Sequence, residues 1–554
     1  MRASRTTARS LPTVVMFFCL LLFPTLALAS EEPPGKIDPS VRTILEATGG
    51  ILAVPVIVSA PGAAADVAAM LPLGVRITRL PIVGGVAAFL TPEEIDALAT
   101  VDSVLEITAD NPVFGFDVAS SMDITNLTIG LGNVAPGDEG GPNGAGVTVA
   151  ILDSGVATNS DLASSRIVGW KDFVNGESMP YDDAGHGTFV AGLIAGDGTG
   201  SLPLEDGGYA TVQFRGVAPA ADIVGIKVLD ETGQGRTSSL IAGIAWAIEH
   251  KADCGIRVLN ISIGGNAVGS IRRDPVAKAV ESAWRQGIVV VCAAGNEGEF
   301  GPGGILSPGN SPFVMTVGAT DTRQTAAVSD DAVAAYSSMG PTLFDECAKP
   351  DLVAPGNRLV SLRTPASFID TNFPENVIPV ADYAPTAPLG TPSNYLMLSG
   401  SSTSAPLVAG AAALMVAEDP TLTPGDVKRR LMATADAVAG ATPYQQGAGT
   451  LDVDEALSST MRADGFALSA YVGDGKNILR NGDYQKWEKR AWSKYGWTKF
   501  KWTKFKWTKF KWTKSEWTDV AWTKFKWTQT EWTKFKWTEY EWTKFKWTVL
   551  LQGQ

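Results

Sequence analysis

The sequence predicts an α/β protein whose main domain is a mostly parallel sheet covered by helices on both faces. Between residues 147 and 457, short and nearly continuous apolar runs alternate with helical segments. Apolar runs of this kind are typical of parallel strands that are buried on both faces. A smaller unit with the element order of a ferredoxin-like α+β fold precedes the main domain, and a tract with tryptophan at every fifth residue follows it.

The composition is that of a folded protein with several domains. The chain has 554 residues, of which 45% are apolar and 19% are charged, and this excludes a largely disordered protein. One of the four cysteines, Cys19, lies near the N-terminus, and the odd number that remains excludes a disulfide scaffold. Cys292 lies in an apolar run and is expected to be a small core residue.

The N-terminal residues 1–29 have the pattern of a secretory signal peptide. Three arginines precede an apolar stretch from Leu11 to Leu28, and the sequence Ala-Leu-Ala at 27–29 ends it before Ser30. We expect cleavage after Ala29; an uncleaved membrane anchor is the alternative. No later segment has the roughly 18 apolar residues that a spanning helix needs. The mature chain is therefore expected to be secreted, extracellular or associated with the cell surface.

Residues 30–112 are predicted to form the small unit, with a Pro/Glu-rich leader to residue 39 and a core at about 51–112. The expected order is β-α-β-β-α-β, as in a split βαβ domain. Thr91 precedes Pro92 as an N-cap with proline at the first helical position, which marks the start of the second helix. The strands are expected at 54–58, 75–80, 83–90 and 104–108, and the first helix at 63–71. A polar, Gly-rich connector at 113–143 follows.

The main domain is expected to occupy residues 144–460. Its strands are predicted at 147–152, 223–229, 258–263, 288–292 and 314–319, and two of its helices at 238–250 and 275–286. In open parallel sheets, ligands bind beyond the C-terminal ends of the strands. Asp153 directly follows the first strand and is therefore placed where a site is expected.

Three residues fit one catalytic mechanism. Ser402 lies in a turn of small residues before the apolar run 407–415, so its hydroxyl is expected at a helix N-terminus, which favours negative charge. Such a serine alone is more often an N-cap. A serine nucleophile needs a base, and the base needs a carboxylate that fixes its tautomer. His186 is the candidate base, since the only other histidine, His250, has no motif around it, and Asp153 is the candidate carboxylate.

Asn296 is a candidate for a fourth role. It follows the strand expected at 288–292, within the run Ala-Ala-Gly-Asn. Its amide is able to donate to the oxyanion of a tetrahedral intermediate together with the backbone N–H of Ser402. Taken alone, an asparagine beside glycines is more often a simple turn residue.

Six motifs in this order resemble the subtilisin family (subtilases, peptidase family S8) of serine endopeptidases. They are Val149 to Gly155, Gly185 to Thr188, Gly216 to Asp222, Val258 to Gly264, Ala293 to Asn296 and Gly400 to Pro406. The resemblance implies that Asp153 orients His186, that His186 is the general base and acid, that Ser402 attacks, and that Asn296 stabilises the oxyanion. It also implies that two backbone segments bind an extended peptide as an added strand. These segments contain Gly233 and Gly235, and Ser262, Ile263 and Gly264.

The resemblance also gives the small unit a role. Residues 30–112 resemble the inhibitor I9-like propeptide of these enzymes, which is cut off by the enzyme itself, here between about Asn111 and Asp123. No cofactor is required for the chemistry. Structural calcium is common in the family, and its ligands here are unknown; Asp182, Asp183 and Asp197 are equally well explained as ordinary acids. Ser401 and Thr403 stand where threonine and methionine are usual, which is a minor departure.

The C-terminal part consists of a linker at 461–486 and the tryptophan tract at 487–548. Residues 484–554 contain 17 Lys and Arg against 6 Asp and Glu, whereas the whole chain has a net charge of −13. A period of five fits neither a helix nor a strand, so a turn-containing or solenoid-like unit is expected. The tract is interpreted either as a packed appendage or as a binding element for polysaccharide or an anionic envelope surface. No nucleic-acid partner is expected in a secreted protein.

We therefore expect a secreted serine endopeptidase, made as a self-processing zymogen, that hydrolyses peptide bonds of proteins through an acyl-enzyme. Its partners are protein or peptide substrates and its own propeptide. The alternative is a catalytically idle surface-binding protein that acts through the tryptophan tract.

Overall fold

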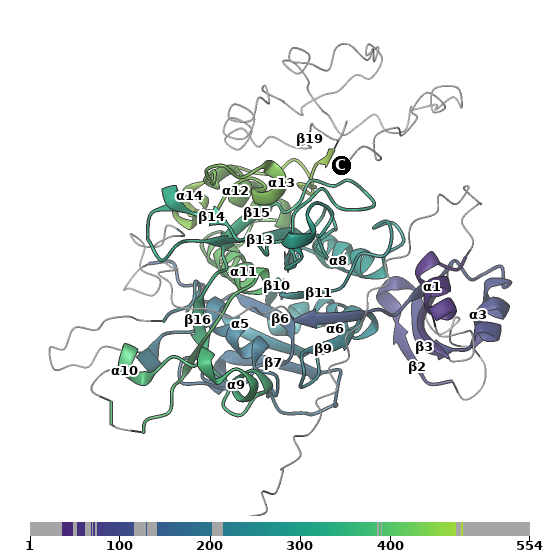
Figure 1. The fold of residues 1–554 in the computed structure, drawn as a ribbon, viewed down its shortest axis with the longest axis horizontal. Coiled ribbons are helices and arrows are strands. Elements are labelled where there is room, and N and C mark those ends of the chain that lie inside the picture. The colour runs from purple at the N-terminus through teal and green to yellow at the C-terminus, as the bar shows by residue number, and fades with distance from the viewer. Residues whose placement is uncertain are drawn as a thin grey trace, which may run out of the picture.

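The computed structural model contains two folded units, which lie side by side in Figure 1. The described residues are 36–47, 53–60, 68, 70–71, 75–115, 129, 141–201, 214–384, 387–388, 390–472 and 478–479. The expected signal peptide, most of the helix expected at 63–71, most of the connector at 113–143 and the tryptophan tract lie outside them.

The larger unit is built around an eight-stranded sheet with the order β14-β13-β12-β10-β6-β8-β7, in which β15 also pairs with β13. All neighbouring strands are parallel except β13 and β14. Every residue of β6 and β12 is buried, as their apolar runs predict. The strands are β6 Thr148–Asp153, β7 Ile167–Asp172, β8 Asp222–Lys227, β10 Ile256–Ile261, β12 Val289–Ala293, β13 Met315–Asp321, β14 Ala332–Val333 and β15 Leu352–Pro355.

Helices cover both faces of this sheet. Helix α5 packs against α11 on one side, and α6 packs against α8 on the other (Figure 1). The predicted α/β class with a mostly parallel sheet is therefore confirmed. The helices of this unit are α5 His186–Ala195, α6 Thr237–Glu249, α7 Lys251–Cys254, α8 Pro275–Arg285, α9 Phe368–Asn372, α10 Val380–Tyr383, α11 Ser401–Glu418, α12 Pro424–Thr434, α13 Pro443–Gln446 and α14 Val453–Ser458.

Several strands were not predicted because their sequences lack an apolar run of strand length. β7 is a partly exposed edge strand that contains Lys171 and Asp172, and β15 has four residues and ends in Pro355. Two small two-stranded antiparallel sheets lie outside the main sheet. They pair β16 Leu359–Leu362 with β17 Tyr395–Leu398, and β18 Tyr471–Val472 with β19 Ile478–Leu479.

The smaller unit has a four-stranded antiparallel sheet with the order β2-β3-β1-β4. Thr91 and Glu94 form the capping box that starts its helix α3. The strands at 54–58, 75–80, 83–90 and 104–108 and the helix after Thr91 all occur close to their predicted positions. The elements are α1 Pro39–Ala47, β1 Val54–Ser59, β2 Ile77–Leu80, β3 Gly85–Leu90, α3 Pro92–Ala99 and β4 Glu106–Ala109.

The folded part of the smaller unit begins earlier than the predicted core at 51–112. Helix α1 starts at Pro39, and Ile37 and Val41 are buried in the core of this unit. Ile37 also bridges to Ile107 of β4. Helix α1 has only nine residues, and the Pro/Glu-rich segment before it shows no periodicity. A short helix at this place was therefore difficult to predict from the sequence.

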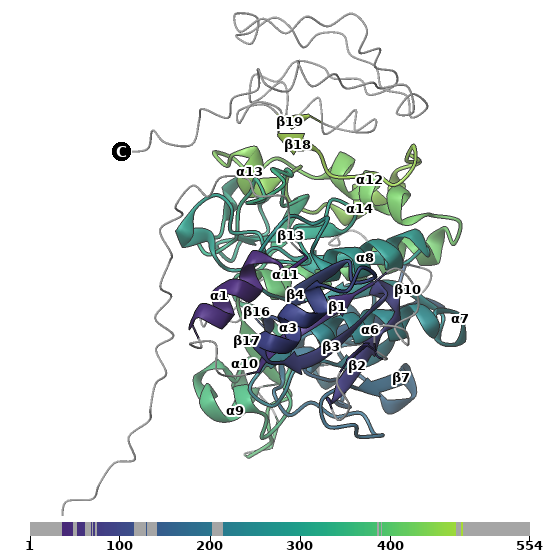
Figure 2. The ribbon, with the colours of Figure 1, turned by 90° about the vertical axis from the view of Figure 1, so that its right-hand side faces the viewer.

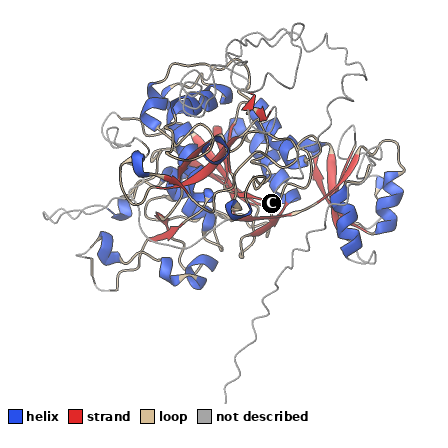
Figure 3. Ribbon diagram, turned by 45° about the horizontal axis from the view of Figure 1, so that its top comes forward, coloured by secondary structure: helices blue, strands red, loops and turns tan. Residues whose placement is uncertain are grey.

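The sheet of the smaller unit faces the larger unit, and its helices lie on the outer side (Figures 2 and 3). Ile57, Leu80 and Ala87 from this sheet belong to the same buried cluster as the core of the larger unit. Strand β2 packs on α6. The contact between the two units is therefore an extension of the hydrophobic core.

A short strand links the two units. Residues expected as the start of a polar connector form β5 Pro112–Gly115, which lies between β11 Ile263–Gly264 and β9 Gln234–Arg236 in a three-stranded antiparallel sheet. The linker expected at 461–486 also differs, because Ser469 and Ala470 are buried against the larger unit. None of the helices within the described ranges is long and apolar enough to cross a membrane.

Candidate active site

Asp153 and His186 meet where β6 ends and α5 begins. The Nδ1 atom of His186 lies 2.7 Å from Oδ1 of Asp153, and both side chains are buried. Gly187 permits this approach, because a Cβ atom at this position would lie 2.0 Å from the backbone oxygen of Gly155. The buried carboxylate therefore fixes the imidazole with its Nδ1 atom toward the strand.

Ser402 is the second residue of α11, a helix of 18 residues, and it is fully buried. The start of this helix is fixed by the hydroxyl groups of Thr403 and Ser404, which donate to the carbonyls of Gly356 and Ala354. Because α11 packs against α5, Ser402 and His186 lie at the starts of two neighbouring helices (Figure 1). The N-terminus of a long helix favours negative charge on an adjacent oxygen.

Asn296 lies between β12 and the start of α11. Its Oδ1 atom accepts a hydrogen bond from the backbone N–H of Ser401 at 2.9 Å, and the Oγ atom of Ser401 accepts one from Gly295 at 2.9 Å. The Nδ2 atom of Asn296 is buried and has no hydrogen-bond partner among the described residues. A buried N–H donor without an acceptor is costly, so this donor points to a ligand that supplies an oxygen.

The predicted substrate segments bind a strand of the chain itself. In the register of β5, Val113 lies opposite Gly235, and Gly115 lies opposite Ile263. Gly264 lies opposite residue 114. The other two predicted residues lie beside these pairs: Gly233 is in the turn before β9, and Ser262 is buried between β10 and β11.

Glycine is required in this sheet for a physical reason. A Cβ atom on Gly235 would lie 2.4 Å from the carbonyl oxygen of Val228 and 3.3 Å from Cγ2 of Val113. A Cβ atom on Gly264 would lie 2.7 Å from the carbonyl oxygen of Ser307. A side chain at either position would therefore clash with the backbone of the larger unit, and at Gly235 it would also crowd Val113 of β5.

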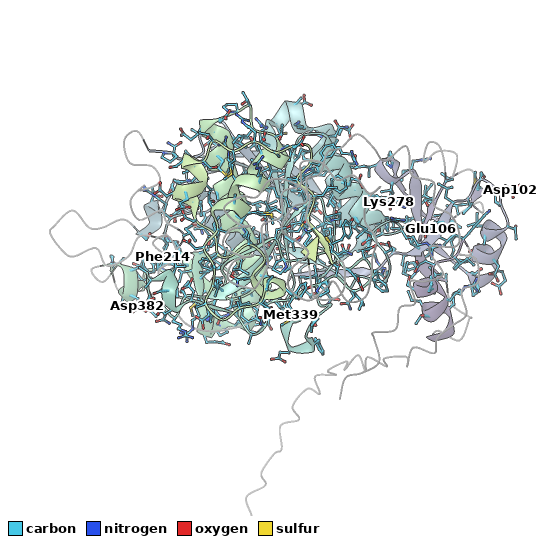
Figure 4. The ribbon with its side chains drawn as sticks, turned by 90° about the horizontal axis from the view of Figure 1, so that it is seen from above. Asp102, Glu106, Phe214, Lys278, Met339 and Asp382 are labelled. Carbon is cyan, nitrogen blue, oxygen red and sulfur yellow. The ribbon has the colours of Figure 1, made fainter. Side chains whose placement is uncertain are left out.

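Acidic residues of the smaller unit contact the helices that begin beside β5. Asp110 accepts two hydrogen bonds from Ser238, one from its backbone N–H and one from Oγ, both at 2.6 Å. Glu106 lies 3.0 Å from Arg273 and 3.9 Å from Lys278, and Figure 4 shows Glu106 and Lys278 together where the two units meet. Desolvation by burial raises the pKa of both Asp110 and Glu106.

The three acids considered as calcium ligands have protein partners. Asp182 accepts hydrogen bonds from three residues, and Asp183 lies 2.5 Å from the ammonium group of Lys227. Asp197 accepts from the backbone and hydroxyl of Thr199. Within the described ranges, no group of three or more His, Cys, Asp or Glu residues is placed to hold a metal. Asp182 does not fit a calcium site, because both of its oxygens already face hydrogen-bond donors, and Oδ1 of Asp183 faces the ammonium group of Lys227.

The sequence analysis missed the roles of two acids. No role is expected for Asp110 from the sequence, and its partner Ser238 lies 128 residues away in the sequence. Asp182 was considered only as a calcium ligand, although it precedes His186 by four residues. The short spacing to a candidate catalytic histidine was the one available signal.

The comparison with known proteins identifies the class. The profile of the subtilase family (Peptidase_S8) matches residues 144–449, so the chain belongs to the subtilase family and carries a subtilisin-type serine endopeptidase domain. The serine protease AprX of Bacillus subtilis is 40% identical over 319 residues, which is 57% of this chain and 66% of AprX, slightly less than two thirds of its length. Subtilisin DY of Bacillus licheniformis is 34% identical over 318 residues, which is 57% of this chain and 92% of that protein.

A solved structure shows the same fold. Fervidolysin from Fervidobacterium pennivorans, described as a keratinolytic enzyme related to subtilisin, is similar to this chain with a TM-score of 0.55. The match covers 74% of this chain and 61% of fervidolysin, at 22% sequence identity. At this identity the likeness concerns the fold alone.

Proposed function

We propose that the chain is the precursor of a secreted serine endopeptidase that hydrolyses peptide bonds of proteins through an acyl-enzyme, with Asp153, His186 and Ser402 as its triad. The observation that carries the proposal is the 2.7 Å contact between buried Asp153 and His186 beside the helix that begins with Ser401 and Ser402. A buried carboxylate on an imidazole beside a helix N-terminus is the arrangement that activates a hydroxyl nucleophile.

The geometry supports the following sequence of steps. The Nδ1–H of His186 donates to Asp153, which leaves Nε2 to accept the proton of Ser402 as its Oγ attacks the carbonyl carbon of the substrate. The oxyanion accepts hydrogen bonds from the backbone N–H of Ser402 and from Nδ2 of Asn296. His186 then gives its proton to the leaving amine, and a water molecule, activated in the same way, releases the acyl group.

Main-chain pairing presents the substrate to these residues. A peptide that adopts the place of β5 pairs on both sides with backbone, opposite Gly235 on one strand and opposite Ile263 and Gly264 on the other. The backbone contacts need no particular side chain, so they hold many protein sequences in the same extended form.

The smaller unit is proposed to be an inhibitory propeptide. It supplies β5, which fills the place of a substrate strand, and it is tied to the larger unit by Asp110 and Glu106. Since β5 is paired as far as Gly115, we expect self-cleavage after this residue and before about Asp123, which narrows the interval expected from the sequence.

The two ends of the chain are proposed to determine where the enzyme is located. Residues 1–29 export it, and the tract at 487–548 attaches it to polysaccharide or another anionic envelope surface, since indole rings alternate there with lysines. A chain that ends at residue 479 should cleave a soluble peptide at the rate of the full chain and lose its retention on isolated envelopes. Equal retention of both chains would contradict the attachment role.

Intact mass of the secreted protein tests the catalytic proposal. We expect the wild type to lose both the signal and the small unit, and Ser402→Ala to lose only the signal. Ser404→Ala is a matched control on the same helix, since its hydroxyl contacts the carbonyl of Ala354 and its loss costs about 1 kcal/mol. If Ser402→Ala matures like the wild type in a host without related proteases, the proposed nucleophile is wrong.

A further inference from the structure

Asp182 is a buried carboxylate that the proposed mechanism does not use. It is 3% exposed, and no Lys or Arg side chain of the described residues forms an ion pair with it. Three residues, Gly185, Thr188 and Ser154, donate hydrogen bonds to it instead. Burial raises the pKa of this carboxyl above its ordinary value. A buried carboxylate without a cation is costly unless hydrogen bonds compensate, so the donors around Asp182 decide what it does.

Two of the donors belong to the start of helix α5. The Oδ1 atom of Asp182 accepts from the backbone N–H of Gly185 at 2.8 Å, and Oδ2 accepts from the N–H of Thr188 at 2.7 Å. Gly185 precedes His186 and cannot cap the helix with a side chain. Asp182 therefore provides the N-terminal cap of the helix that carries the candidate base.

The third donor belongs to the loop after strand β6. Oδ1 of Asp182 also accepts from Oγ of Ser154 at 2.8 Å, and this Oγ atom accepts in turn from the N–H of Gly187 at 3.0 Å. The backbone N–H of Ser154 donates to Oδ1 of Asp153 at 2.7 Å. Asp182 thus joins, through one serine, the end of the strand that carries Asp153 and the start of the helix that carries His186.

Neighbouring contacts keep the turn around Asp182 in place but do not replace it. Buried Lys227 donates to the carbonyl oxygen of Ser154 at 2.6 Å and to Asp183 at 2.5 Å. The N–H of Phe368 donates to the carbonyl oxygen of Asp183 at 2.8 Å. Both contacts hold the outer side of the turn. Among these residues, Asp182 is the one whose side chain contacts both the helix start and the strand end.

We infer that Asp182 is a positioning residue for catalysis: its carboxylate, acting through Ser154, keeps the imidazole of His186 aligned on Asp153. This inference rests on the proposed function of these two residues. A catalytic group must be held within about 0.5 Å of its productive position, and a shift of about 1 Å can cost about 100-fold in rate. Asp182 itself does not touch the substrate strand or the reacting atoms.

Replacement by asparagine tests the inference with little change of volume. In Asp182→Asn, one carboxylate oxygen becomes an NH₂ group, which cannot accept a hydrogen bond. If Oδ2 is replaced, the hydrogen bond from Thr188 is lost, and if Oδ1 is replaced, those from Gly185 and Ser154 are lost. We expect kcat on a soluble peptide to fall about 10- to 100-fold, while KM stays within about threefold because β9 and β11 are unchanged. When kcat is plotted against pH, the fall on the acidic side should move to lower pH, since a misaligned Asp153 stabilises the imidazolium of His186 less.

Two further variants separate positioning from loss of charge and loss of stability. Ser154→Ala keeps the charge of Asp182 and removes the connecting hydroxyl, and it should lower kcat and move the fall on the acidic side in the same direction. Asp161→Asn removes another buried carboxylate, which accepts from Tyr395 and Gly200 rather than from Ser154 or the start of α5. This control should lower the melting temperature and leave kcat and the pH profile unchanged.

Two results would overturn the inference about Asp182, and two others would contradict the proposed function. The inference is overturned if Asp182→Asn lowers the melting temperature but keeps the kcat and pH profile of the wild type. If Asp182→Asn does not fold, Ser154→Ala decides, and a folded Ser154→Ala protein with wild-type kcat and pH profile also overturns it. An inactive wild type, or an active Ser402→Ala protein, would instead contradict the proposed function.

Discussion

At the scale of single residues, Asn296 shows why an amide is needed beside the nucleophile. Its carbonyl oxygen accepts from Ser401 at 2.9 Å, while its buried Nδ2 atom has no partner among the described residues. An aspartate in the same place would present a second acceptor, and its charge would repel an oxyanion. In the proposed mechanism the side chain therefore performs two tasks, since it fixes the start of α11 and keeps one donor for the transition state.

Asn296→Ala removes this donor, and we expect kcat to fall strongly while KM changes little, because the oxyanion exists only in the transition state. In subtilisin itself, removal of one such donor costs about 100- to 1,000-fold in kcat. Steady-state kinetics on a soluble peptide measures the effect, with Asn310→Ala as a control at another buried asparagine. Equal losses in both variants would indicate a general loss of structure.

Candidate site residues could be identified from the sequence where the signal was local. Asp153 follows an apolar strand, His186 and Ser402 lie in short motifs, and the structure brings Asp153 and His186 into contact. The roles of Asp182 and Asp110 depend on partners 28 and 128 residues away, Ser154 and Ser238. A carboxylate reveals its partner only after the strands and helices are packed, so a single sequence could not assign these roles.

At the scale of elements, helix α6 depends on the smaller unit for its N-terminal cap. Its own N-cap residue, Arg236, makes no side-chain cap. Instead, the N–H of Thr237 donates to the carbonyl of Asn111, and the N–H of Ser238 donates to Asp110. A helix at 238–250 could be predicted from the sequence, but the origin of its cap could not, because the cap comes from another unit.

Asp110→Ala should weaken the binding of the smaller unit to the larger unit after self-cleavage. Loss of an N-cap costs about 1–2 kcal/mol, which corresponds to roughly a 10-fold weaker complex. We expect a shorter lag before peptidase activity appears in the secreted protein, measured with a soluble peptide. Asp102→Ala is the matched control, because Asp102 lies at the end of the smaller unit remote from the larger one (Figure 4). An unchanged lag in Asp110→Ala would show that Asp110 does not contribute to inhibition.

At the scale of the whole molecule, a buried charge cluster joins distant parts of the larger unit. Asp351, before β15, lies 2.7 Å from Lys349 and 3.2 Å from Lys428 of α12. Lys428 also donates to the carbonyl of Val314 and to Oγ of Ser469, in the segment after the last helix of the domain. The residues around 469 are therefore part of the folded unit, which explains why the expected linker begins later than predicted.

This cluster gives the stability of the protein a defined pH dependence. Burial lowers the pKa of Lys428 from 10.5 to about 7. Between pH 7 and about 10, the unfolded chain therefore binds a proton at this lysine that the folded chain does not bind. The free energy of unfolding from this group rises with pH across that window and is constant below it. The expected slope between pH 7 and 8 is about 1 kcal/mol per pH unit.

Urea denaturation of the Ser402→Ala chain, which avoids self-digestion, measures this slope. We expect the unfolding free energy to rise between pH 7 and 8, and Lys428→Met to remove about 1 kcal/mol per pH unit from the slope. Lys171→Met, on edge strand β7, should keep the slope of the parent chain. If Lys428→Met also keeps that slope, Lys428 stays charged in the folded protein, and the ion pair with Asp351 outweighs the cost of burial.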